Sequence, residues 1–223
     1  NIAYPLALLG ERPVLMATAG QDFDDYRRWL DGAGIDTSLV REVGDKFTAS
    51  FFCSTDKTGN QIASFYTGAM ADAGALSFRD AGGCDLAIIS PNDPGAMVGY
   101  ARECRELGIP YIYDPSQQVA RMDGAALADG VVGARIIICN DYEYEILREK
   151  TGLDSDAMLR TAEAVIVTKG EQGSAILLRD RTVTTPAVAP DAAVDPTGVG
   201  DAFRGGLMKG LAVGASWETC GRL

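Results

Sequence analysis

The sequence contains no histidine at all. Its absence excludes every catalytic centre or metal site that requires an imidazole, including the Ser-His-Asp triad and the zinc sites of metalloproteases. The chain has five cysteines, an odd number, and none of them forms a C-x-x-C pair. We therefore expect neither a disulfide framework nor a cysteine-based zinc site, but reduced thiols in a cytoplasmic protein.

Long apolar runs and positive charge are also scarce. No run approaches the roughly 20 apolar residues that a membrane-spanning helix needs, and no secretory leader is visible. Lysine and arginine together number 20 against 31 acidic residues, so the formal net charge is −11. Nucleic acid and anionic membranes are therefore unexpected partners. A phosphate-bearing ligand would need a local source of positive charge, such as backbone N–H groups, a metal ion or a few basic side chains.

What the chain does contain suits a folded α/β domain. Its 223 residues are 47% hydrophobic, enough for one sizeable core. From Cys84 onward, segments typical of strands and helices alternate, and this alternation predicts a parallel sheet covered by helices on both faces. The expected strands span 85–90, 109–113 and 134–139, and the expected helices span 93–108, 124–132 and 142–151.

Polar clusters follow the expected strands at the points where they end. Ligands of a parallel α/β sheet lie beyond the carboxyl ends of its strands, so we expect these clusters to face one crevice. The clusters are Ser90-Pro91-Asn92, Asp114-Pro115-Ser116-Gln117, Asn140-Asp141-Tyr142-Glu143 and Thr168-Lys169-Gly170.

Two earlier segments alternate apolar and polar residues without a helix beside them. Residues 46–55 and 61–67 are separated by the turn Lys57-Thr58-Gly59-Asn60, which predicts a β-hairpin that lies apart from the parallel sheet. Before this hairpin, Asp22 is a plausible cap for an expected helix over 22–34.

The stretch Val194–Gly206 carries the clearest chemical signal. Gly198-Val199-Gly200 forms a tight turn that leads into an expected helix, and the N–H groups at a helix start favour an anion. Asp201 would repel a phosphate, but it could take a proton from a hydroxyl that attacks a phosphoryl group. The alternative is an ordinary capping aspartate on a glycine-rich loop.

Two familiar phosphate-binding motifs do not fit this stretch. A dinucleotide fingerprint from Gly198 would require glycine where Phe203 stands, so a Rossmann oxidoreductase is not indicated. A P-loop from Gly200 would require lysine where Gly206 stands.

The pattern D-x-T-G-x-G-D-A-F-x-G-G resembles the second signature of the ribokinase-like, or PfkB, family of sugar and nucleoside kinases. The resemblance implies that Asp201 is the catalytic base and that Gly198, Val199 and Gly200 form the anion hole. It also implies a ribokinase-like three-layer α/β/α fold with a mostly parallel central sheet. Residues 1–223 would form a single domain, with 46–68 contributing a β-hairpin to a small lid.

Other segments match the family in the same order along the chain. N-x-x-E at Asn140 and Glu143 resembles the motif that organises Mg²⁺, largely through water, although a helix-capping pair would look the same. T-x-G-x-x-G at Thr168, Gly170 and Gly173 resembles the turn that frames the ATP phosphates and ribose, although a plain hairpin turn is the alternative. With Asn140, these three residues are the implied nucleotide-binding set.

The substrate side is less specific. Asn1 resembles the asparagine that contacts the substrate hydroxyls, or is an ordinary residue at a helix start. Phe65 could stack on a base or sugar ring, although aromatic residues in a hairpin more often pack against the sheet. Asn92 is a further candidate at a strand end. Both chain ends lie within apolar, helix-like runs, so we expect the natural protein to continue beyond Asn1 and Leu223.

These resemblances imply a kinase that uses ATP and Mg²⁺ to phosphorylate a primary hydroxyl. The hairpin and the segments 114–118 and 140–143 look like those of bacterial adenosine kinase-like members, so a nucleoside, chiefly adenosine, is the expected substrate. A ribokinase-type sugar kinase and a non-catalytic nucleotide-binding sensor are the alternatives. A homodimer through the lid is also plausible.

Overall fold

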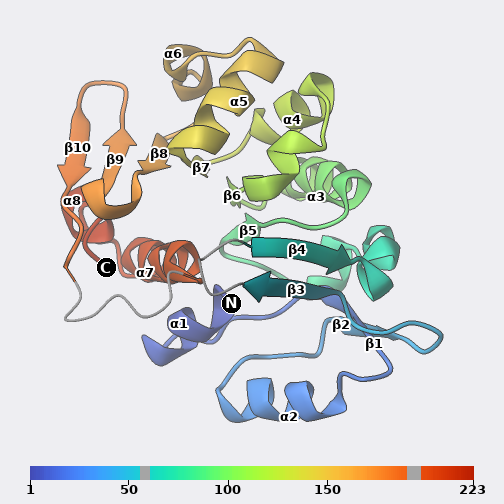
Figure 1. Ribbon diagram of the computed structural model, residues 1–223. Coiled ribbons are helices and arrows are strands. Elements are labelled where there is room, and N and C mark those ends of the chain that lie inside the picture. Colours follow the sequence, from blue (N-terminus) through green and yellow to red (C-terminus); the bar gives the residue numbers. More distant parts are fainter. Residues whose placement is uncertain (56–60, 190–196) are drawn as a thin grey trace.

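The computed structural model describes residues 1–55, 61–189 and 197–223 (Figure 1). The expected turn over 57–60 and the first three residues of the glycine-rich signature, Val194–Pro196, lie outside these described residues.

The central sheet has six strands in the order β10-β9-β8-β7-β6-β5. The four strands from β5 to β8 run parallel, and β9 and β10 continue the sheet antiparallel, so the sheet is mostly parallel as predicted. The strands are β5 (Ala87–Ile89), β6 (Tyr111–Tyr113), β7 (Ile136–Asn140), β8 (Ala164–Thr168), β9 (Ser174–Leu177) and β10 (Thr182–Thr185).

Alternate residues of these strands enter two different cores, because successive side chains point to opposite faces. Tyr111, Ile137 and Val165 belong to one buried cluster, and their neighbours Ile112 and Ile136 belong to the other. The first core is covered by α3 (Pro94–Leu107), α4 (Gly124–Val131), α5 (Asp141–Thr151) and α6 (Ser155–Leu159). The second is covered by α7 (Val199–Ala212) and α8 (Trp217–Cys220), so three layers form (Figure 1).

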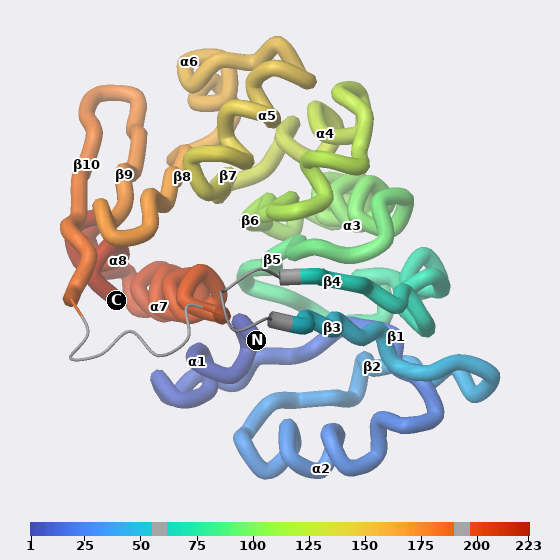
Figure 2. The backbone as a smooth tube through the Cα atoms, viewed as in Figure 1, coloured from blue at the N-terminus to red at the C-terminus, as the bar shows by residue number. Residues whose placement is uncertain are grey.

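The first helix, α1 (Ala3–Leu8), packs against α7 although the two are separated by most of the chain. Lys209 of α7 donates to Glu11 just after α1, with Nζ 2.6 Å from Oε1. This packing brings the beginning of the chain to the beginning of α7, as Figure 2 shows.

Two smaller sheets lie outside the six-stranded one. The parallel pair β1 (Ala17–Gly20) and β2 (Val40–Val43) packs with α2 (Asp24–Gly32) around Phe23, Leu30 and Ile35. The hairpin β3 (Ser50–Thr55) and β4 (Gln61–Tyr66) forms the other sheet, which confirms that it stands apart. Short 3-10 turns span Gly68–Ala75, Phe78–Ala81, Ser116–Ala120 and Gly170–Gln172.

The structure corrects the expected role of Asp22. It does not cap α2, whose N-cap is Phe23 without a side-chain bond. Instead, Asp22 Oδ1 accepts from the backbone N and from Oγ1 of Thr48, at 2.8 and 2.7 Å. These bonds lower the pKa of Asp22, and they fasten the chain just before the hairpin.

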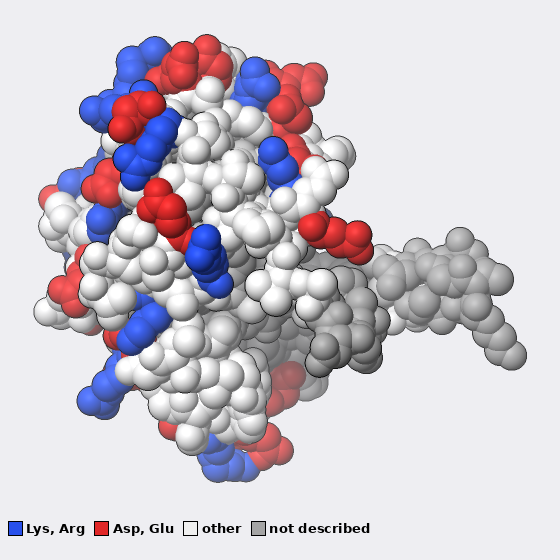
Figure 3. Space-filling view, turned by 90° about the vertical axis from the view of Figure 1, so that its left-hand side faces the viewer, with Lys and Arg blue, Asp and Glu red and all other residues white. Residues whose placement is uncertain are grey.

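Charges of both signs are interspersed on the face that carries β10 and α8 (Figure 3). No broad basic area is seen on this face among the residues that the structure describes. Within the same residues, no helix is long and apolar enough to cross a bilayer.

Replacing Gly130 with alanine should destabilise the fold. Gly130 lies in α4, and a Cβ there would stand 2.1 Å from Tyr113 Cζ, in a ring that is fully buried and cannot retreat. Overpacking of this kind costs about 1–3 kcal/mol, which chemical denaturation would measure. Gly99→Ala is the matched control: this helical glycine is exposed with open space around it, so alanine should stabilise by roughly 0.5–1 kcal/mol. An unchanged unfolding free energy for Gly130→Ala would contradict the packing described here.

Candidate active site

Polar side chains gather beyond the carboxyl ends of the parallel strands, as the sequence predicted. After β5, Ser90 Oγ lies 3.4 Å from Asp114 Oδ2, which follows β6. The Gln118 amide donates to the Asn92 carbonyl oxygen at 2.6 Å. Asn140 and Thr168 are register partners at the ends of β7 and β8. The four strand ends therefore line one edge of the sheet.

Asn140 and Glu143 form a complete capping box at the start of α5. The Asn140 backbone N donates to Glu143 Oε2 at 2.9 Å, and the Glu143 N donates to Asn140 Oδ1 at 2.7 Å. Ser116 Oγ donates to the other carboxylate oxygen, Oε1, at 3.2 Å. Ser116 holds a left-handed φ of 43°, unusual for a residue with a side chain. Glu143 is thus fixed and buried beyond the end of β7.

This arrangement suits an indirect contact with a metal ion. Both oxygens of Glu143 already accept a hydrogen bond, and no cluster of three or more His, Cys, Asp or Glu able to hold a metal occurs among the described residues. Mg²⁺ retains several waters and needs few protein ligands. The Asn140–Glu143 pair therefore fits Mg²⁺ as a partner of its water shell, and fits poorly as a complete ligand set.

The helix α7 begins as the glycine-rich signature requires. Gly198 is its N-cap in the left-handed conformation, with φ of 84°, which glycine adopts without strain. The Ala202 N donates to the Gly198 carbonyl oxygen at 2.9 Å, so helical bonding starts there. The preceding N–H groups, those of Val199, Gly200 and Asp201, belong to the first turn, which lacks intrahelical acceptors. This end of α7 is suited to an anion.

Asp201 lies in that first turn and contacts the start of the chain. The Asn1 side-chain amide donates from Nδ2 to Asp201 Oδ2 at 3.0 Å. The two residues are separated by nearly the whole sequence and meet because α1 packs on α7. The sequence assigned both to the substrate side, and the structure brings them together.

The sequence analysis missed Arg204, which lies one helical turn after Asp201. Its guanidinium holds Asp114 with two bonds, Nε to Oδ2 at 2.5 Å and Nη2 to Oδ1 at 2.6 Å. Burial raises the pKa of the Asp114 carboxyl, and the Arg204 charge opposes that effect. A signal was available: Arg204 is a charged residue within a run of small and apolar residues, so its burial required a partner.

The remaining candidates lie in two separate places. Gly170 and Gly173 flank the short turn between β8 and β9, with φ of 55° and 82°, and the Lys169 N donates to the Gly173 oxygen at 2.8 Å. Phe65 lies in β4, partly exposed and paired with Phe51 across the hairpin.

The cysteine nearest these strand ends is not a candidate nucleophile. Cys139 precedes Asn140 in β7 and is buried. Burial raises the pKa of its thiol well above the ordinary value, so the reactive thiolate does not form near neutral pH.

Known proteins resemble the chain along its whole length. The chain is 33% identical to a nucleoside kinase of Methanothermobacter thermautotrophicus, over all of this chain and 73% of that protein. It is 42% identical to a cytidine kinase of Thermococcus kodakarensis, over all of this chain and 82% of that protein.

Solved structures agree with these relatives. The nucleoside kinase of Burkholderia thailandensis in complex with inosine has a TM-score of 0.94 at 39% identity, over 99% of this chain and 73% of the other. The same enzyme in complex with ADP-inosine has a TM-score of 0.93 at 39% identity, over 99% of this chain and 70% of the other. The predicted ribokinase-like α/β fold is confirmed by this likeness.

The family model described as pfkB family carbohydrate kinase matches residues 1–223. The chain therefore belongs to the PfkB family and is an ATP-dependent kinase, as its glycine-rich signature predicted.

Proposed function

We propose that this kinase transfers the γ-phosphoryl group of ATP to a primary hydroxyl of a nucleoside, with Asp201 as the general base. The observation that carries the proposal is the place of Asp201, three residues after left-handed Gly198 in the first turn of α7, with Oδ2 3.0 Å from the Asn1 amide nitrogen. A carboxylate beside a helix start can accept a proton where the N–H groups receive negative charge.

The chemistry follows from this juxtaposition. Asp201 takes the proton of the acceptor hydroxyl, whose oxygen then attacks the γ-phosphorus in line with the leaving ADP. The charge spreads over the phosphoryl oxygens, and the N–H groups of Gly198–Gly200 stabilise it with the dipole of α7. Asn1 donates to Asp201 and so orients the carboxylate toward the substrate hydroxyl.

The nucleotide side is assigned to the neighbouring strand ends. Thr168, Gly170 and Gly173 frame the ATP phosphates and ribose at the β8–β9 turn, which follows the strand paired with Asn140. Bound Mg²⁺ would neutralise phosphate charge there. Asn140 and Glu143, which the capping box holds in place, would orient the water shell of that ion.

A nucleoside is favoured over a free sugar by the names of the relatives, two nucleoside kinases and a cytidine kinase, one of them solved with inosine. Adenosine remains our first choice on the motifs of the hairpin and of segments 114–118 and 140–143. Phe65 would stack on the base, and Asn92 would contact the substrate at the end of β5. The sugar-kinase alternative is supported by the family model, whose description is pfkB family carbohydrate kinase.

The lid is assigned to the hairpin, 46–68, which would close over the substrate and join a second copy of the chain. Side chains on both of its faces are exposed: Phe51 and Phe65 on one, Phe52 and Ile62 on the other. One face is available to the substrate and the other to a partner hairpin, which supports a homodimer.

Asp201→Asn should abolish most of the activity and leave ATP binding intact. The amide cannot accept the hydroxyl proton, and positioned proton transfer contributes roughly 10²–10⁴-fold. Turnover would be measured by ADP release and the ATP Kd by calorimetry. Asp156→Asn removes an exposed aspartate in the first turn of α6, away from the strand ends that carry the site, and serves as the control. Full turnover in Asp201→Asn would refute the assigned base. ATP binding without transfer to any acceptor by the unaltered protein would favour a sensor.

Glu143→Gln should raise the Mg²⁺ concentration required for half-maximal activity by about tenfold, the lower end of the 10–100-fold range for outer metal partners. Glutamine can still accept the Asn140 N–H, so the cap and the unfolding free energy are retained while the negative charge is lost. Glu145→Gln changes an exposed acid on the same helix, paired with Arg148, and should have no effect. An unaltered Mg²⁺ dependence in Glu143→Gln would remove this residue from the metal's surroundings.

The acceptor can be identified with a panel of nucleosides and sugars in the ADP-release assay. We expect adenosine to give the highest kcat/KM, with inosine and cytidine as the closest competitors. Free ribose should be poor, because it lacks the base that Phe65 would contact. Preference for ribose over every nucleoside would replace the nucleoside assignment with the sugar kinase.

A further inference from the structure

The ion pair between Arg204 and Asp114 is the most deeply buried one in the described part of the chain. Its side chains are 7% and 2% exposed, whereas both side chains of every other ion pair found there are at least 22% exposed. Burying two charges is costly, and apolar residues of similar volume are often at least as stable. A contribution to the free energy of unfolding is therefore a weak explanation for the presence of this buried pair.

The guanidinium connects the end of β6 with the first turn of α7. Two of its nitrogens hold the two oxygens of Asp114, and its third, Nη1, donates to the Gly200 carbonyl oxygen at 3.0 Å. All three nitrogens are therefore engaged within the protein. Arg204 thus links the Asp114 carboxylate to the backbone of α7.

The bond to Gly200 has a consequence for Asp201. No cis peptide bond occurs within the described residues, so the Gly200 carbonyl and the Asp201 N–H lie in one plane and point in opposite directions. The side-chain bond to the Gly200 oxygen therefore restrains the direction of the Asp201 N–H and the position of the Asp201 Cα. This one contact acts on the last residue of the anion hole, Gly200, and on the Cα from which the base extends.

We propose that Arg204 is a positioning residue for phosphoryl transfer: anchored on Asp114, it holds the Gly200–Asp201 peptide so that base and anion hole keep one geometry. The inference rests on the proposed role of Asp201. A residue in this role acts through Asp201 and Gly200, so its removal should lower kcat and leave the Kd values for ATP and nucleoside within about threefold. A displacement of about 1 Å can cost on the order of 10²-fold in rate.

The test replaces the pair as a unit, with Asp114→Leu and Arg204→Met together, so that no charge is left buried alone. We expect kcat to fall about 10–100-fold, with little change in thermal stability. Arg204→Lys is the second variant: it keeps the charge but cannot make three divergent bonds, so kcat should fall there too. If the double variant does not fold, Arg204→Lys alone decides the question.

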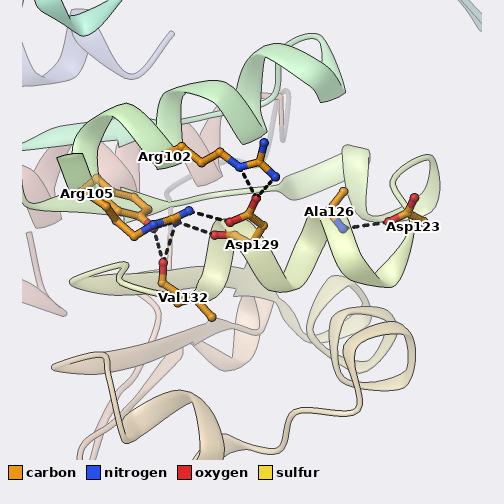
Figure 4. Close-up of polar contacts among 7 residues, drawn as sticks. Arg102, Arg105, Asp123, Ala126, Asp129 and Val132 are labelled. Carbon is orange, nitrogen blue, oxygen red and sulfur yellow. Dashed lines mark hydrogen bonds and ion pairs between the residues drawn. The ribbon is translucent and has the colours of Figure 1, made fainter. Parts of the chain in front are cut away.

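A pair that joins two other elements provides the matched control. Arg105 of α3 donates from Nη2 to Asp129 Oδ1 of α4 at 2.6 Å, beside Arg102 (Figure 4). Arg105 lines a surface pocket with Pro110 and Ala134, at the ends where β6 and β7 begin and opposite the candidate site. Arg105→Lys should therefore leave kcat unchanged.

A double-mutant cycle separates positioning from an independent role. In an Asp201→Asn background, Arg204→Lys should lower kcat less than it does in the wild-type protein, because the part of its effect that acts through the base is already absent. If the kcat losses of Asp201→Asn and Arg204→Lys multiply when the two changes are combined, the inference is overturned. A wild-type kcat in both Arg204 variants would overturn it as well. An active Asp201→Asn variant would instead overturn the assignment of the base, so the two failures are distinguishable.

Discussion

The arrangement of the candidate site depends on the buried contact between Arg204 and Asp114. Without it, α7 would be held on the sheet mainly by apolar packing, which is not directional. Two charge-assisted bonds of 2.5 and 2.6 Å define how the start of α7 is set against the end of β6. The glycine-lined start of α7 is thereby positioned on the sheet, and α1, which packs on α7, brings Asn1 to Asp201.

The sheet supplies the rigid base for that joint. Its parallel strands are buried on both faces, because alternate residues such as Tyr111 and Ile112 enter separate cores. The strand ends thereby become a fixed row from which Asp114, Asn140 and Thr168 emerge. The side chains of the candidate site are thus carried by strand ends and by helix starts that the buried sheet holds in a fixed order.

Local patterns made much of this predictable, and long-range pairings did not. The strand–helix alternation after Cys84 and the hairpin over 46–67 were visible, because each depends on the spacing of nearby apolar residues. The short strand Val40–Val43 was missed, since its register with Ala17–Gly20 is set by folding and not by its own four residues. Asp22 was assigned to a cap, although Thr48, far along the chain, competes for the same oxygen. Asn1 was found only through its resemblance, as its partner is 200 residues away.

The acidic residues of the site are of two kinds, which differ in the hydrogen bonds that their carboxylates accept. Asp114 and Glu143 are buried, and each carboxylate oxygen already has a donor, so their charge serves to hold neighbouring groups. Asp201 is only half-buried and meets the neutral Asn1 amide. Both oxygens of Asp114 are held by the Arg204 guanidinium, whereas Asp201 in its proposed role accepts the proton of the substrate hydroxyl. Asp114 and Glu143 thus hold the structure of the site, and Asp201 is the carboxylate proposed to react with the substrate hydroxyl. The hydrogen-bond partners of each carboxylate distinguish these two roles.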